Sequence, residues 1–119
     1  MLEEVVQSAI FLAHFLRDKR GGPSTETVNM FCQELAFRLF QRVHKIWRLN
    51  DPLKGSGYRA ITCYSTLDPI LVETALYVNI DVGTLSRFLP RNLTLFTDPG
   101  SSSFRINEGP VCMYYQTPL

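Results

Sequence analysis

The sequence predicts an α+β fold in which helices pack on one face of a small antiparallel sheet. Two long amphipathic segments occupy residues 2–49, and the remainder alternates short helix signals with runs of strand-forming residues. Residues 51–57 contain one proline and two glycines, so they separate these halves. A chain of 119 residues is large enough for one hydrophobic core, and we expect a single domain over residues 1–119.

The first predicted helix covers residues 2–20. Apolar side chains recur there at spacings of three and four residues, as one face of a helix requires. This core stripe comprises Leu2, Val5, Val6, Ala9, Ile10, Ala13 and Leu16. Phe11 and Phe15 fall on the polar side instead. They indicate either cover by another part of the chain, which is the more common arrangement, or a surface for self-association.

The second predicted helix begins after Ser24, a suitable N-cap, and runs to about Leu49 with a bend or break near Val43. Its apolar stripe comprises Val28, Phe31, Cys32, Leu35, Leu39, Val43 and Ile46. Only a short Gly-Pro turn joins the two helices, so we expect them to pack antiparallel.

Shorter elements follow. Aspartate N-caps predict helices over residues 68–78, with Pro69 at the first helical position, and over residues 81–88. Runs of strand-forming residues predict strands at 58–63, 93–97, 103–107 and 111–116. Residues 98–100 match a type II turn, and the last two strands are expected to form a hairpin.

The composition argues against several classes of protein. A net charge of +1, from 12 basic and 11 acidic side chains, argues against a predominantly electrostatic grip on nucleic acid or on anionic lipid. We therefore interpret Arg38, Arg42, Lys45 and Arg48 as a solvated helix face. No apolar run is long enough to span a bilayer and no signal peptide is evident. Three widely spaced cysteines fit reduced thiols in a cytoplasmic or nuclear protein.

No motif indicates catalysis, a metal site or a cofactor. Residues 54–57 look superficially like a phosphate-binding loop, but the lysine leads and the loop joins a helix to a strand. The three cysteines, His14 and His44 lack the close spacing of zinc ligands. Neither histidine lies near a nucleophile motif. We therefore expect a protein that is not an enzyme. Its aromatics Tyr58 and Phe96, on strands near loops rich in proline and glycine, could anchor an interface, although core packing is the usual role of either residue taken alone.

Several stretches of the chain resemble the two conserved boxes of the BTG/Tob antiproliferative domain. These are Lys54-Gly55-Ser56-Gly57-Tyr58-Arg59-x-Ile61, Asp68-Pro69-Ile70, and Leu89-Pro90-x-x-Leu93-Thr94-Leu95-x-x-Asp98-Pro99. Residues 104–109, Tyr115 and Ile46-Trp47 continue the resemblance in register. The departures from the family pattern indicate a divergent member, similar to the germline Tob proteins of nematodes.

The resemblance implies a non-enzymatic adaptor that binds the nuclease subunit of the Ccr–Not deadenylase complex and represses target mRNAs. Such proteins control proliferation or cell fate. In the family, a tyrosine at the position of Tyr58 and a tryptophan at the position of Phe96 form the core of the deadenylase-binding face. Lys54 belongs to the first box with Tyr58, and Asp98 belongs to the second with Phe96.

Two departures fall on this face. The box tryptophan is Phe96, which could cost on the order of 1–2 kcal/mol of binding free energy at a hot spot. Residues 98–102 lack an aromatic and a carboxylate that the family has, and Gly100 with three serines predicts a looser turn. The alternative function is therefore a self-associating assembly protein or transcriptional co-regulator with weakened deadenylase binding.

Overall fold

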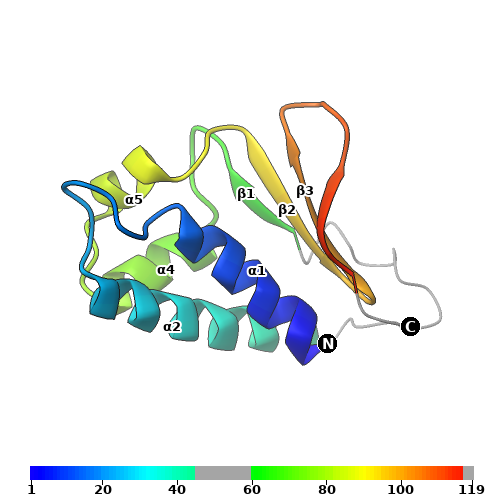
Figure 1. Ribbon diagram of the computed structural model, residues 1–119, viewed down its shortest axis with the longest axis horizontal. Coiled ribbons are helices and arrows are strands. Elements are labelled where there is room, and N and C mark those ends of the chain that lie inside the picture. The colour runs from blue at the N-terminus through cyan, green and yellow to red at the C-terminus, as the bar shows by residue number, and fades with distance from the viewer. Residues whose placement is uncertain (45–59, 117–119) are drawn as a thin grey trace.

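The computed structural model describes residues 1–44 and 60–116, and within them the predicted α+β fold is confirmed. The elements in chain order are α1 (Leu2–His14), α2 (Thr25–Val43), β1 (Ile61–Cys63), α4 (Pro69–Tyr77), α5 (Val82–Phe88), β2 (Leu93–Asp98), β3 (Ser101–Ile106) and β4 (Cys112–Gln116). Figure 1 shows the helices gathered on one side of the twisted sheet. None of the described helices is long and apolar enough to cross a membrane.

The four strands form one sheet in the order β1-β2-β3-β4, with every neighbouring pair antiparallel. Helix α1 packs on α2 and also on strands β2, β3 and β4, so it forms the layer between the second helix and the sheet (Figure 1). Helix α4 also packs on α2, and it contacts the short α5. The core therefore lies on both sides of α1.

The position of α1 explains why its buried surface is wider than the predicted stripe. Leu2 and Ile10 were predicted in the core, yet they are 62% and 47% exposed. Glu4 and Ser8, which are polar, are buried against the sheet instead. A helix held between two layers must bury two faces, whereas periodicity of apolar residues reveals only one.

Helix α1 ends at His14, six residues before the predicted end at Arg20. The Phe15 and Leu16 amides donate to the carbonyls of Leu12 and Ala13, each only three residues back, at 3.2 and 2.9 Å. Tightening of this kind is common where a helix stops. Asp18 then takes a left-handed conformation with φ of 55°, which an aspartate tolerates. These turns keep Leu16 fully buried while the chain reverses toward α2.

The predicted helix caps are confirmed. The Thr27 amide donates to the Ser24 hydroxyl at 3.2 Å, and the Ile70 and Thr84 amides donate to the carboxylates of Asp68 and Asp81 at 3.1 and 3.2 Å. Asp68 also pairs with Arg42 of α2 at 3.2 Å, which ties the start of α4 to α2. The predicted continuation of the second helix to Leu49 lies outside the described residues.

The strands match their predictions with shifted boundaries. Strand β3 begins at Ser101, two residues early, because Asp98 pairs directly with Ser101 across the turn. Gly100 in that turn has φ of 86°, the left-handed value that a type II turn requires. Strands β3 and β4 form the expected hairpin. The first residues of the strand predicted at 58–63 lie outside the described residues, and β1 is recorded from Ile61.

Candidate functional site

Strand β2 divides its side chains between the two faces of the sheet. Leu93 and Leu95 are buried toward the helices, and the Thr97 hydroxyl lies 2.6 Å from that of Ser8 on α1. The alternate residues therefore lie on the other side, which we call the outer face. Register and alternation place on it Thr62, Thr94, Phe96, Asp98, Ser101, Ser103, Arg105 and Met113.

Phe96 lies in the middle of the outer face. It pairs across the sheet with Ser103, which in turn pairs with Met113 of β4. Phe96 is half-buried and Met113 is 57% exposed. Phe96 and Met113 thus flank the buried Ser103 on this face. Aromatic residues and methionine are both enriched where proteins bind one another.

Asp98 lies at the end of the same row of alternate residues, but it is buried. The turn that follows it is held to the first turn of α1, where the Gly100 amide donates to the Glu4 carboxylate at 2.9 Å. The Ser102 hydroxyl donates to the Glu4 carbonyl at 3.2 Å. The turn that was expected to be looser is thus tied to α1 by the Gly100 amide and the Ser102 hydroxyl.

The Glu4 carboxylate is stabilised in its charged form at this junction. Burial acts to raise its pKa, but hydrogen bonds from the Gly100 and Glu4 amides and the Met1 amino group, 3.1 Å away, outweigh burial and lower the pKa. A lowered pKa means that the folded protein favours the ionised carboxylate. Glu4 thus fixes the end of the sheet that carries Asp98.

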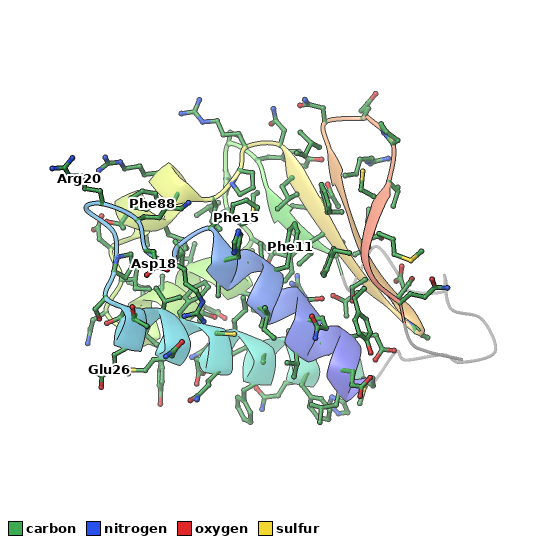
Figure 2. All side chains as sticks on the ribbon, in the orientation of Figure 1. Phe11, Phe15, Asp18, Arg20, Glu26 and Phe88 are labelled. Carbon is green, nitrogen blue, oxygen red and sulfur yellow. The ribbon has the colours of Figure 1, made fainter. Side chains whose placement is uncertain are left out.

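Phe11 and Phe15, the residues predicted as a possible surface for self-association, pack inside the chain. The Phe11 ring stacks on Tyr114 and Phe104, with centroids 4.3 and 5.1 Å apart, and meets Phe15 edge-on at 5.4 Å. Figure 2 shows Phe11 directed from α1 toward the strands. Both rings lie partly buried against the core. The two aromatics on the polar helix face are therefore explained by cover from β3 and β4.

A bulge in β4 supports this inner packing. Ser102 pairs with Tyr115 and Ser103 with Met113, so Tyr114 is an extra residue between them. Both tyrosines consequently reach α1: the Tyr114 hydroxyl donates to Ser8 at 3.0 Å, and the Tyr115 hydroxyl donates to Glu3. Burial raises the pKa of Tyr114 to about 12 despite its hydrogen bonds to Ser8 and Ser102.

Two of the four residues predicted to bind a partner, Lys54 and Tyr58, lie outside the described residues. The structure brings the other two, Phe96 and Asp98, onto one face of one strand. Arg105 and Met113 share this face and were not predicted from the sequence. Side chains alternate between the two faces along residues 103–105. Assigning Phe104 to the core therefore places Arg105 on the outer face, and this alternation is the signal that could have revealed it.

A cavity of about 470 Å³ lies elsewhere, between the segments that flank β1 and the start of β2. Its lining comprises Cys63, Tyr64, Ser65, Leu67, Ser86, Leu89, Pro90, Arg91 and Asn92. Burial raises the pKa of the Cys63 thiol to about 12, with the neighbouring Asp68 charge contributing, so this thiol is a poor nucleophile. Within residues 1–44 and 60–116, no group of His, Cys, Asp and Glu side chains could hold a metal ion.

Comparison with known proteins gives consistent matches. The BTG family model matches residues 1–116. Human Protein BTG1 is 35% identical over 117 residues, covering 98% of this chain and 68% of BTG1. Human Protein BTG2 is also 35% identical over 117 residues, covering 98% of this chain and 73% of BTG2. A BTG family protein of Dictyostelium discoideum is 34% identical over 104 residues, covering 87% of this chain and 24% of that protein.

A solved structure agrees at the level of the fold. The BTG/Tob domain of C. elegans FOG-3 superposes with a TM-score of 0.88, covering 98% of this chain and 91% of that one. Its sequence identity is 24%, so this likeness concerns the backbone arrangement alone.

Proposed function

The chain belongs to the BTG family, and from this premise we propose that it is a non-enzymatic adaptor that binds the nuclease subunit of the Ccr–Not deadenylase complex. Members of this family are antiproliferative regulators rather than enzymes. Binding would bring the deadenylase to selected mRNAs in the cytoplasm, the nucleus or both. Repression of those mRNAs would control proliferation or cell fate, including fate in the germ line.

The observation that carries this proposal is the position of Phe96. It stands at the centre of the outer face, half-buried, with the exposed Met113 two strands away. The resemblance puts the family's binding tryptophan at the same position. A phenyl ring retains most of the apolar surface of an indole but lacks its N–H, so the partner would bind more weakly while using the same surface.

The remaining predicted residues have distinct roles in the proposal. Tyr58 and Lys54 contribute contacts through the first box, as the resemblance implies. Asp98 is buried at the end of β2, so it would act by holding the turn beside Phe96 rather than by reaching a partner.

Self-association is the alternative function, together with a role as a transcriptional co-regulator. Its motivation was the pair Phe11 and Phe15, and these rings pack against Phe104, Tyr114 and each other. We therefore give the adaptor function preference and treat oligomerisation as an outcome to be measured.

Titration calorimetry of the purified domain with the deadenylase nuclease subunit tests the adaptor proposal. Wild-type domain should bind at tens of micromolar or tighter, and Phe96→Ala and Tyr58→Ala should each weaken binding about tenfold or more. Tyr77→Ala is the matched control, because Tyr77 is 66% exposed on α4 in the helical layer. Absence of binding by wild type, or equal losses in all three variants, would contradict the proposal.

A further inference from the structure

Arg105 occupies the outer face beside Phe96. It pairs with Thr94 in the register of β2 and β3, and Phe96 is the next outer-face residue along β2, paired with Ser103. Arg105 and Phe96 are therefore diagonal neighbours on the same face, within reach of one another's side chains. The inner neighbour Phe104 packs under α1, which fixes Arg105 on the opposite side.

The guanidinium of Arg105 lacks the ion-pair partners that other half-buried arginines of this protein have. Its Nε is buried without a hydrogen-bond acceptor, and no carboxylate in the described residues forms an ion pair with it. By contrast, Arg38 and Arg42 on α2 are paired with Glu34 and Asp68. The Arg105 side chain is only half-buried, so its terminal nitrogens retain contact with solvent.

A buried donor with no acceptor destabilises the free domain, and native proteins rarely leave one. The terminal nitrogens of the same guanidinium are accessible, so a partner can supply an acceptor to them. A guanidinium matches a carboxylate in two parallel hydrogen bonds, and this geometry is specific to arginine.

We propose that Arg105 binds a carboxylate of the partner protein that docks on Phe96. This inference rests on the proposed adaptor function and names the chemistry of the partner's surface. The partner would present an Asp or Glu side chain beside an apolar one, so that the apolar group covers Phe96 and Met113 while the carboxylate accepts hydrogen bonds from Arg105.

Charge on the outer face favours a protein over RNA as the occupant. Arg105 is the only cation among the outer-face strand residues that the structure describes, and Asp98 carries a carboxyl group on the same face. A nucleic-acid backbone is held by several cations acting together. A single arginine beside a phenyl ring suits one carboxylate within an apolar contact instead.

The test compares Arg105→Met with Arg20→Met, which removes the same charge from an exposed position in the turn between α1 and α2 (Figure 2). Affinity for the nuclease subunit should fall about ten- to hundredfold for Arg105→Met and stay unchanged for Arg20→Met. The dependence of affinity on salt concentration should become shallower only for Arg105→Met, because an intermolecular ion pair has been removed. Arg105→Lys, which keeps charge but loses the paired geometry, should be intermediate.

Thermal unfolding of the free variants separates binding from folding. Arg105→Met should be at least as stable as wild type, since an unsatisfied buried donor is replaced by an apolar chain. Weakened binding accompanied by an equally large loss of stability would assign Arg105 a structural role and overturn the inference.

The remaining outcomes distinguish the inference from the function on which it rests. If wild type and Arg105→Met bind with the same affinity and salt dependence, the inference is wrong and the adaptor function stands. If wild type does not bind the subunit, both fail. If an oligoadenylate RNA binds the free domain with comparable affinity through Arg105, the occupant is RNA and the inference is overturned.

Discussion

The two faces of the sheet consist of alternate residues of the same strands, but they are held in place differently. On the inner face, Leu93 and Leu95 are buried against the helical layer, and Thr97 is held by Ser8. On the outer face, Phe96 and Arg105 are half-buried, and Arg105 has no carboxylate partner in the described part of the chain.

This difference indicates which residues of the sheet can be substituted with least effect on folding. An inner residue cannot change size without leaving a cavity or overfilling the core beside α1. The outer residues Phe96 and Arg105 are only half-buried, so they can change with a smaller effect on folding, and under the proposed function their identity matters for binding. The resemblance places the most consequential departure from the family, phenylalanine for tryptophan at Phe96, on the outer face.

The largest expected effect contrasts adjacent residues of β2. Leu95→Ala should lower the free energy of unfolding by about 2–5 kcal/mol, because Leu95 is fully buried. Phe96→Ala should lower it by no more than about 1–2 kcal/mol, since its ring is already partly solvated. Urea denaturation of both variants measures the difference. Equal losses of stability in the two variants would show that Phe96 is as much part of the core as Leu95. The two faces of the sheet would then not differ in their contribution to folding.

A smaller effect concerns the tie between α1 and the β2–β3 turn. Glu4→Gln should lower stability at pH 7 by on the order of 1–2 kcal/mol, because hydrogen bonds to a charged carboxylate become bonds to a neutral amide. The pKa of Glu4 is lowered from 4.5 in the folded chain. Its contribution is therefore complete above pH 4.5 and is lost as the pH falls through the folded value.

Urea denaturation at several pH values checks this sign. The difference in stability between wild type and Glu4→Gln should be largest near neutrality and should shrink below pH 4.5. A difference that stays constant from pH 7 to pH 3 would show that the carboxylate charge does not hold the turn.

The tryptophan that the resemblance places at Phe96 allows a test from the binding side. Phe96→Trp should raise affinity for the nuclease subunit about tenfold, equivalent to about 1.4 kcal/mol, while leaving the stability of the free domain within about 0.5 kcal/mol. Calorimetry and thermal unfolding measure the two quantities. A variant that loses stability without gaining affinity would mean that the outer face has no room for an indole.

The smallest effect is a difference in thiol chemistry rather than in free energy. Cys63 is buried on the inner side of β1 with its pKa raised to about 12, whereas Cys112 on β4 is exposed. Ellman's reagent at pH 8 should therefore modify Cys112 in the folded protein and reach Cys63 only after unfolding. Simultaneous labelling of both thiols would indicate that the inner face opens readily.

Much of the fold could be predicted from the sequence because its signals are local. The aspartates at 68 and 81, with Pro69, determine where α4 and α5 begin, and Gly100 supplies the left-handed conformation for the turn. The early end of α1 could not be predicted, because it depends on tertiary packing. The tighter hydrogen bonding at Phe15 and Leu16 accompanies the burial of the Leu16 side chain in the core.

The site was less predictable because it depends on pairing between distant strands. Phe96 could be singled out from the sequence, but its neighbours Arg105 and Met113 join it only through the register of β2, β3 and β4. The role of Phe11 was ambiguous for the same reason, since its partners Phe104 and Tyr114 are about a hundred residues away in the chain.

Sedimentation equilibrium of the domain, alone and mixed with the nuclease subunit, would show whether the outer face binds this partner. We predict a monomer that forms a one-to-one complex with the subunit, and loss of that complex with Phe96→Ala, whose fold is monitored by circular dichroism. A domain that self-associates and forms no complex, or a complex that survives Phe96→Ala unchanged, would contradict the assignment of the outer face as the binding surface.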